Sequence, residues 1–406
     1  MTLSLFILLC VLLAIAIRQY SPWHLPIWMI LSVGAIAELV FQQINIIAAW
    51  HAINWDVIGF LFGVFVISQA LESSGYLILL TDRLLVRSRE AYLTLAMMML
   101  VMGVASAFLM NDTLAIIGTP IVLQLTREKQ KLQRVFLMAL AFSVTIGSVM
   151  SPIGNPQNLL IAIASQLSFV TFIRYLFLPT MLCLTLAYVV LVVVYRKTLA
   201  QPIMPLPQLK LQDIALARWA KRSMWLFLLL IAVKIAGEIE QVKWHLAFSG
   251  IAMVSALPVL LGSRQRLSVI KKIDWGTLIF FASLFVVVQA VWDSGYLQQL
   301  TQHQNITSVP SIFMISTLLS QLISNVPLVA LYLPILHHAG ANTQHYLALA
   351  VGSTLAGNLL LFGAASNIII TQNAEKRGEQ GLPFWQFSII GIPLTLVSLL
   401  IYSLFV

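Results

Sequence analysis

The chain has 406 residues, of which 60% are hydrophobic and only 9% are charged, and its formal net charge is +9. A soluble protein of this size would carry far more charge on its surface, so the composition excludes an ordinary soluble domain. Apolar segments recur along the whole chain, and about 20 helical residues suffice to cross a membrane. A basic chain can also bind nucleic acid. Here the basic residues lie in short loops between apolar segments, so we reject that interpretation.

In chain order, the hydrophobic segments predict an all-α integral membrane protein with about 10 transmembrane helices and two re-entrant hairpins. The first segment has no basic region before it and no clear cleavage site after it, so we expect a span rather than a signal peptide. The hairpins are predicted at 91–126 and 309–338, where a polar turn interrupts the segment and the second arm is short. Two tilted full spans at each place are the alternative. Full spans are expected at 3–17, 23–40, 54–71, 134–165, 172–195, 223–237, 245–262, 275–292, 345–373 and 383–405.

The basic residues predict the orientation. If the polar loop 196–222 is cytoplasmic and each span changes sides, only Arg174, Lys234 and Lys243 of the 23 basic residues fall toward the other face. Positive charge retained in the cytoplasm is what sets membrane topology. We therefore expect a multi-pass protein of the prokaryotic inner membrane with both termini outside the cytoplasm.

The two halves of the chain resemble each other. Residues 53–77 and 273–297 are identical at 11 of 25 positions without a gap, including Trp55/Trp275, Gln69/Gln289 and the run SGYL. Two later matches follow in the same order, 111–121 with 325–335 and 155–161 with 364–370. Because the predicted spans 54–71 and 275–292 run in opposite directions, the repeat should be inverted, as in many secondary transporters.

This repeat divides the chain into five parts. We expect N-terminal scaffold helices over 1–52, a first repeat over 53–195 with a hairpin at 91–126 and a broken helix at 134–165, a cytoplasmic linker over 196–222, further scaffold helices over 223–272, and a second repeat over 273–406 with a hairpin at 309–338 and a broken helix at 345–373.

Four places in the apolar segments carry helix breakers beside polar groups, one hairpin turn and one broken span in each half. Unwound backbone at membrane depth is tolerated only where protein or a hydrated cavity satisfies its polar groups. Its carbonyls suit a cation such as Na⁺, its N–H groups suit an anion, and Asn and Ser side chains serve either charge. Kinks in simply packed helices are the structural alternative. The candidate ion- and substrate-binding residues are Asn111, Asp112, Thr113, Ser151, Gly154, Asn155, Asn158, Ser324, Asn325, Gly363, Ser366 and Asn367.

Asp112 is the acidic residue that the prediction places in an intramembrane turn, and its counterpart in the second half is Val326. A carboxylate at membrane depth suggests proton or cation handling, and an N-cap of the following arm is a compatible role. Lys234 is expected to reach toward the outer interface. The other acids near spans are expected at helix ends within reach of water: Glu38, Asp56, Glu72, Glu238, Asp274 and Asp293.

These polar sites resemble those of the ion transporter superfamily, which includes arsenite permeases, NhaD-type sodium/proton antiporters, citrate transporter-like permeases and divalent anion:sodium symporters. The resemblance covers most of the chain from about Trp55 onward. The run NDTLAIIGTPI at 111–121 looks like the first hairpin of arsenite permeases. The runs SPIGNPQNLLI and GNLLLFGAASNIII look like the two broken spans of the bacterial citrate transporter-like branch.

The resemblance implies roles for the hairpin tips. The divalent anion:sodium symporters carry a Ser-Asn-Thr motif at each tip, and here Asn111 and Asn325 keep the Asn of that motif. By this resemblance both would bind substrate or the coupling cation, with a possible Na⁺ at Asn111, Gly154 and Asn325. A homodimer is plausible on the same ground.

The function expected from these features is secondary active transport of a small anion or oxyanion, coupled to H⁺ or Na⁺, by alternating access. Arsenite efflux, Na⁺/H⁺ antiport and, less favoured, a passive channel are the alternatives. No phosphate-binding GxxxxGK[ST] run and no pairing of nucleophile with base stand out, so neither ATP-driven pumping nor an enzyme is expected. No cofactor or further metal is expected, and the partners are the small anionic substrate and the lipid bilayer.

Overall fold

The computed structural model describes residues 2–17, 26–76, 90–127, 129–203, 213–242, 246–295 and 307–406. In these residues the regular structure is helical, apart from a single β-bridge between Glu90 and Pro202. Some residues used in the predictions lie outside the described ranges: the loop residues Arg18, Arg83, Arg87, Arg89 and Lys243, the linker residues Pro205, Pro207 and Lys210, and Leu77, Tyr296 and Leu297 of the repeated SGYL run.

The helices follow one another in two series of similar order. The first series is α1 (Leu3–Ile17), α2 (Ile27–Val40), α3 (Ile46–Ala52), α4 (Trp55–Ser74), α6 (Ala91–Leu109), α7 (Asn111–Leu125), α8 (Gln130–Ser148), α9 (Pro156–Ser165) and α10 (Phe169–Leu199). The second series is α11 (Ile214–Ile239), α12 (Phe248–Gly262), α13 (Arg266–Lys272), α14 (Trp275–Asp293), α16 (Val309–Ile323), α17 (Asn325–His338), α18 (Thr343–Leu359), the 3₁₀ turn η2 (Leu361–Gly363), α19 (Ala365–Glu375) and α20 (Phe384–Ser403).

The chain is a helical integral membrane protein. Five described helices are long and apolar enough to cross a bilayer, namely α4, α6, α10, α14 and α20, and four shorter apolar helices accompany them. The helix pairs α6–α7 and α16–α17 occupy the segments predicted as hairpins, and α8–α9 and α18–α19 occupy those predicted as broken helices. The number of full spans stays a prediction, because α1, α2 and α12 have only 14 or 15 residues each.

Two features depart from the sequence-based boundaries. Helical structure extends into both ends of the predicted linker 196–222, since α10 ends at Leu199 and α11 begins at Ile214. The seven-residue helices α3 and α13, which precede α4 and α14, were not predicted.

Matching local signals begin and end α4 and α14. The side chains of Asn54 and Asp274 accept hydrogen bonds from the backbone N–H groups of Val57 and Thr277, at 3.2 and 3.0 Å. Each bond satisfies one of the backbone N–H groups that have no partner within the first turn of a helix. Beyond the helix ends, Gly75 and Gly295 adopt left-handed conformations with φ of 73° and 78°. Glycine takes this conformation without a steric penalty.

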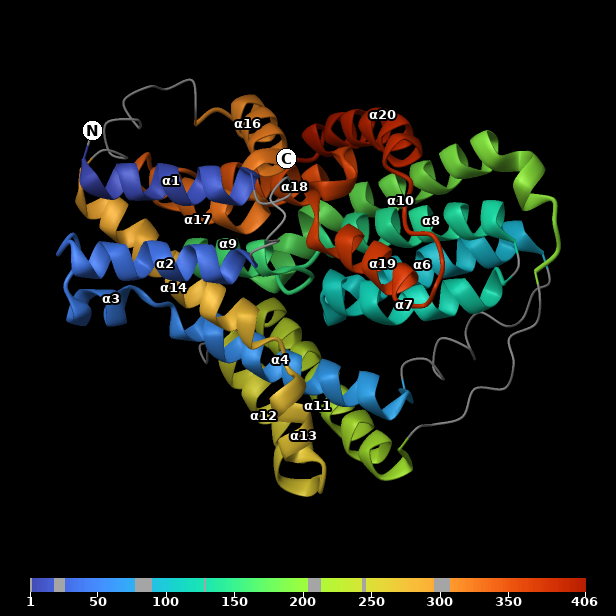
Figure 1. Ribbon diagram of the computed structural model, residues 1–406, viewed down its shortest axis with the longest axis horizontal. Helices are drawn as coiled ribbons and strands as arrows, with labels where there is room; N and C mark the ends of the chain where they lie inside the picture. Colours follow the sequence, from blue (N-terminus) through green and yellow to red (C-terminus); the bar gives the residue numbers. More distant parts are fainter. Residues whose placement is uncertain are drawn as a thin grey trace.

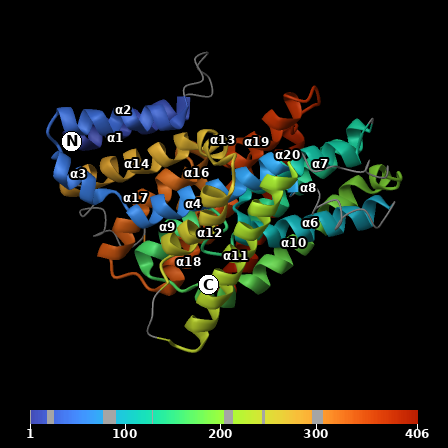
Figure 2. The same ribbon diagram turned by 90° about the horizontal axis from the view of Figure 1, so that it is seen from below.

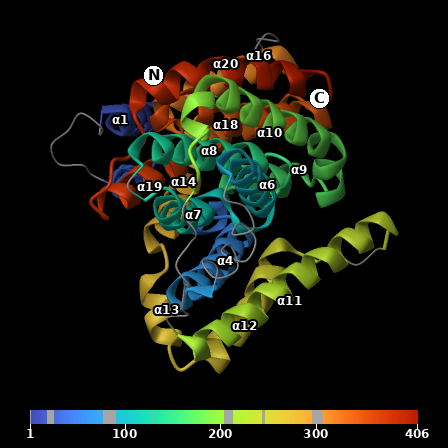
Figure 3. The same ribbon diagram turned by 90° about the vertical axis from the view of Figure 1, so that its right-hand side faces the viewer.

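Some helices pack against the other series, and others pack within their own series. α12 packs along α4, α14 packs along α2, and within the series α6 pairs with α8 and α16 with α18. Figure 1 shows α4, α11, α12 and α13 as an arm that projects from the rest, and Figure 3 shows α11 and α12 far from α16 and α20. In Figure 2, α1 and α2 lie at one edge and the end of α11 at the opposite edge. In Figure 1, α6 and α7 lie toward one end of the long axis and α17 toward the other.

Two glycines let α6 and α8 approach each other closely. A Cβ atom placed on Gly147 of α8 would lie only 2.0 Å from the carbonyl oxygen of Gly103 on α6. Small residues that let two backbones approach are typical of helix pairs in membranes, where lipid tails are as apolar as side chains and packing supplies the attraction. This contact fixes α8, and therefore the break at its end, against the first arm of the hairpin.

We predict that Gly147→Ala lowers the melting temperature of the purified protein by a few degrees, because the added methyl group forces α6 and α8 apart at a cost of about 1–3 kcal/mol. Thermal unfolding in detergent measures the effect. Gly250→Ala is the matched control, since Gly250 is also helical and has no heavy atom within 4 Å of its added Cβ. Equal melting temperatures for the two variants would contradict the packing argument.

Candidate functional site

Both hairpins turn through a strained residue. Met110, between α6 and α7, has φ 57° and ψ 135°, and Ser324, between α16 and α17, has φ 73° and ψ 156°. Neither is glycine, and such a conformation costs about 1–3 kcal/mol. In each hairpin the next residue is the Asn that begins the second arm, Asn111 or Asn325, and both side chains are buried, at 6% and 8% exposure.

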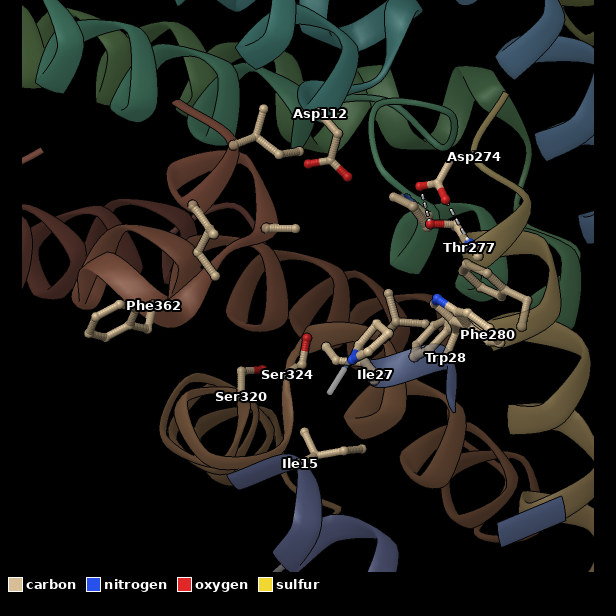
Figure 4. Close-up of a pocket in the computed structure, with 18 of the residues that line it drawn as sticks. Ile15, Ile27, Trp28, Asp112, Asp274, Thr277, Phe280, Ser320, Ser324 and Phe362 are labelled. Carbon is tan, nitrogen blue, oxygen red and sulfur yellow. Dashed lines mark hydrogen bonds between the residues drawn. The ribbon is translucent and has the colours of Figure 1, made fainter. Parts of the chain in front are cut away.

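The two tips meet one cavity of about 340 Å³. Asp112 reaches it from the first hairpin, and Ser324 and Val326 reach it from the second (Figure 4). Trp28 of α2 and Asp274 at the start of α14 also line the cavity. The walls thus come from both hairpins, both breaks and the helices expected to form the scaffold.

The cavity is acidic. Asp112 is partly buried, and Asp274 is exposed and caps α14, accepting from the backbone N–H of Thr277 at 3.0 Å and from its hydroxyl at 2.5 Å. Figure 4 shows both carboxylates on the same side of the space. No Lys, Arg or His occurs among the described residues that line it. Any charge that the cavity itself supplies through side chains is therefore negative.

Asp112 does not cap α7, so the N-cap interpretation was wrong. The cap position is Met110, and Asp112 is the second residue of the helix. Its backbone N–H donates to Oδ1 of Asn111 at 3.0 Å, and its own carboxylate is left facing the cavity. Next to it, the hydroxyl of Thr113 donates to Ser68 of α4 at 3.2 Å, which ties the first tip to α4.

The first tip is bonded to the first break. The backbone N–H of Asn111 donates to the carbonyl of Gly154 at 2.9 Å. A Cβ on Gly154 would lie 2.4 Å from the carbonyl oxygen of Ser148, so the close turn requires glycine. The Ser151 hydroxyl accepts from the backbone N–H of Ile153 at 3.2 Å. The oxygens of Asn111 and Gly154, both named as possible Na⁺ ligands, are therefore already hydrogen-bonded.

Two asparagines hold the first break open. Asn155 caps α9 through its Oδ1, and its amide donates to the hydroxyls of Ser148 and Thr354, each at 3.1 Å. The Asn158 amide lies 3.0–3.3 Å from three backbone carbonyls of the unwound segment, those of Ser148, Val149 and Ser151. Both side chains are fully buried, so their first task is to satisfy the opened backbone.

Thr354 of α18 joins the two broken helices. Its hydroxyl accepts from Asn155 and Gln157, at 3.1 and 3.4 Å, and donates to Oδ1 of Asn158 at 3.2 Å. Sequence reasoning did not name Thr354. If the alignment of 155–161 with 364–370 is extended toward the N-terminus, Thr354 pairs with Thr145, and this match could have identified Thr354.

The second break is less satisfied than the first. The Asn367 amide donates to the carbonyl of Gly357 at 2.7 Å, but Oδ1 of Asn367 has no hydrogen-bond partner among the described residues. Gly363 is enclosed like Gly154, with the Ala356 carbonyl oxygen 2.5 Å from an added Cβ. The same lack of a partner within the described chain is found for other buried oxygens around this break and the second tip, those of Thr145, Ser320, Asn325, Asn358 and Ser366.

The structure also places two charged residues, Glu38 and Lys234, that the sequence singled out. Glu38 was expected within reach of water, but its side chain is fully buried, because α1 packs on α2 and covers it. Lys234 forms an ion pair with Glu238 at 3.1 Å and donates to the Leu246 carbonyl at 3.1 Å. The other oxygen of Glu238 accepts from the backbone N–H of Val170 at the start of α10, so this pair links α10 to α11 and α12.

A helical membrane protein whose broken helices and hairpin tips line a cavity that contains two carboxylates has the architecture of a polytopic membrane transporter. The sequence model of the citrate transporter family matches residues 10–346, and the chain belongs to this family. Its family and relatives are transporters and permeases rather than enzymes.

Individual relatives span almost the whole chain. The chain is 30% identical to the silicon efflux transporter LSI3 of rice, over 90% of this chain and 89% of that protein. It is 31% identical to the inner membrane protein YbiR of Escherichia coli, over 86% and 87% of the two chains. It is 22% identical to the putative transporter arsB of Dictyostelium discoideum, over 93% and 87%. These relatives fall within the ion transporter superfamily that the hairpin and break motifs indicated.

Among solved structures, the chain is similar to MtrF of Neisseria gonorrhoeae, described as a member of a class of antimetabolite efflux pumps. The TM-score is 0.53 over 92% of this chain and 83% of that chain, at 14% sequence identity. At this identity the likeness concerns the fold.

We predict that Thr354→Val destabilises the protein by about 1–3 kcal/mol, because it leaves buried amide groups of Asn155, Gln157 and Asn158 without their partner. Thr145→Val, the same change at the matching position, removes a hydroxyl that has no partner in the described chain and should cost less. Thermal unfolding in detergent without sodium or substrate compares the two. A larger loss for Thr145→Val would show that Thr354 does not hold the breaks together.

Proposed function

We propose that this chain is a secondary active transporter that moves a small anion or oxyanion across the inner membrane together with H⁺ or Na⁺. The observation that carries the proposal is the charge of the cavity, where Asp112 and Asp274 face the space and no basic side chain is present among the described lining residues. An anion brought beside carboxylates away from bulk water is repelled unless a cation accompanies it. Coupling to a cation is therefore what these charges favour.

The anion itself would be held by dipoles and hydroxyl groups. α7 and α17 both begin at the tips, and the positive end of the helix dipole favours negative charge. Ser320 and Ser324 line the cavity opposite Asp112, and the Ser320 hydroxyl has no partner among the described residues. Neutral donors of this kind can bind oxyanions without a fixed positive charge.

Each coupling ion has its own candidate position. Asp112 would take up H⁺, because its carboxylate faces the cavity. The Asn111 oxygen beside it already accepts a hydrogen bond from the helix backbone, so the first tip is a poorer position for Na⁺. Na⁺ would bind at the second tip and break, where Oδ1 atoms of Asn325 and Asn367 have no partner in the described chain. Uncharged amide and hydroxyl oxygens are suitable ligands for such a cation.

Alternating access is supported by cavities on two sides of the tips. The main cavity lies at the start of α14 and beside Pro26 and Ile27 of α2, the ends that the charge distribution assigns to the cytoplasm. A second cavity of about 250 Å³ lies toward the other ends of the same elements, with Gln289 of α14 and His337 of α17 in its walls. We propose that α4–α10 and α14–α20 are inverted repeats whose hairpins and breaks move between these two access routes.

A second candidate is efflux of an uncharged weak oxyacid in exchange for H⁺. The relatives named for silicon efflux and arsB favour it. The acidic cavity suits it as well, since a neutral, hydroxyl-rich molecule is not repelled by carboxylates. In this case Asp112 would bind a proton when the oxyacid leaves the cavity and release it when the next oxyacid molecule binds.

We predict that Asp112→Asn reduces proton movement coupled to transport at least tenfold, because the amide cannot bind and release a proton. Proteoliposomes containing a pH-sensitive dye would be given arsenite, silicic acid or citrate, and the dye response recorded. Asp56→Asn is the control, since Asp56 is an exposed acid in the first turn of α4 that lines neither described cavity. Unchanged proton movement in Asp112→Asn would remove the role assigned to Asp112.

We also predict that NaCl, but not choline chloride, raises the melting temperature of the wild-type protein, and that Asn325→Ala abolishes this increase. A ligand present at 100 times its dissociation constant stabilises the folded protein by about 2.7 kcal/mol. Asn111→Ala is the matched variant and should keep most of the increase, because the Asn111 oxygen is already bonded. If wild-type protein does not respond to Na⁺, H⁺ alone is the coupling ion.

A further inference from the structure

One face of α11 carries a groove that the proposed transport cycle does not use. It has a volume of about 510 Å³ and is lined by Arg218, Lys221, Arg222, Trp225, Leu226 and Leu229. These residues repeat at intervals of three and four, so they follow one stripe along the helix. The opposite stripe, which includes Leu216, Ala220 and Phe227, is buried, because α11 packs there on α4 and α12.

The groove is ordered along the helix axis. Three cations come first, and Trp225 and Leu229 follow on the same face, 57% and 59% exposed. In the predicted topology the cations lie at the cytoplasmic end and the apolar residues lie deeper in the bilayer. A basic end, an aromatic ring at the interface and an apolar tract match the headgroup, glycerol region and acyl chains of a phospholipid.

The cations are free to bind an anion. Among the described residues no ion pair involves Arg218, Lys221 or Arg222. The Arg222 guanidinium lies 4.5 Å from the centre of the Trp219 ring, which orients it without neutralising it. The nearest acid in sequence, Asp213, is occupied as the cap of α11 and as a partner of Gln265.

We propose that this groove is a binding site for an anionic phospholipid of the cytoplasmic leaflet, such as phosphatidylglycerol. The phosphate binds Arg218, Lys221 and Arg222, and the acyl chains lie over Trp225, Leu226 and Leu229. Charge complementarity favours this occupant over a zwitterionic lipid, and the exposed apolar tract favours it over free phosphate. The bound lipid anchors α11, and with it the projecting arm of α4, α11 and α12, against the membrane.

The test is binding of lipids to the purified, full-length protein in neutral detergent, measured by native mass spectrometry and by the shift in melting temperature. Phosphatidylglycerol should bind and stabilise, and phosphatidylcholine should not. The triple variant Arg218→Gln/Lys221→Gln/Arg222→Gln should bind phosphatidylglycerol about a hundredfold more weakly, since each basic residue near an anionic lipid contributes about 1 kcal/mol. Trp225→Ala, which keeps all three charges, should weaken binding by a smaller factor.

A second triple variant, Arg264→Gln/Arg266→Gln/Lys271→Gln, removes the same charge from exposed positions next to and within α13 that do not line the groove. It should retain wild-type lipid affinity. An equal loss in this control, equal binding of both lipids, or full stabilisation by inorganic phosphate alone would each overturn the proposal. So would a change from dimer to monomer in the groove variant without a change in lipid binding, since the face would then bind a second copy.

Discussion

The structure depends on one constraint: backbone that is opened inside a membrane must find hydrogen-bond partners within the protein. The break between α8 and α9 meets this constraint through Asn155 and Asn158, whose amides bond unwound carbonyls and hydroxyls while their oxygens bond the next helix start and Thr354. Thr354 belongs to the other half of the chain. The first break therefore takes a hydrogen-bond partner from the other half, whereas the Asn367 amide of the second break bonds Gly357 within its own half.

The halves share this architecture but differ in how completely it is satisfied. At the first tip, the backbone of Asn111 is bonded to Gly154 and its side chain is bonded to the next residue. At the second tip the Asn325 oxygen has no partner in the described chain, and the oxygens of Asn367 and Thr145 nearby share this condition. The two tips therefore differ: the first presents a carboxylate to the cavity, and the second holds an amide oxygen without a partner in the described chain. In the proposed transport cycle, this difference would let a proton and a second ion bind to separate groups.

The sequence predicted where the apolar helices are interrupted, because the interruptions depend on local chemistry. Pro156, Gly154 and the Asn residues beside them interrupt long apolar runs, and such residues disfavour a continuous helix in any context. The same reasoning did not find α3 and α13, whose seven residues are too few to show a helical period. It also misplaced Glu38 and did not name Thr354 or Asp274 as site residues, because burial under α1, a bond across the halves and a shared cavity are properties of the tertiary structure.

The cavity charge also constrains which cargo and which ion can be bound together. With Asp112 and Asp274 both ionised, the cavity holds two negative charges, of which the exposed Asp274 can be screened by water and salt. A monovalent anion bound with a proton on Asp112 leaves the same total charge as a neutral acid bound beside ionised Asp112. The two proposed modes are therefore electrostatically equivalent once bound, and they differ in which partner carries the proton into the site. An anion of higher charge, such as citrate, would need at least one further cation, and in the proposed cycle the Asn325 oxygen, which has no partner in the described chain, is the candidate ligand for it.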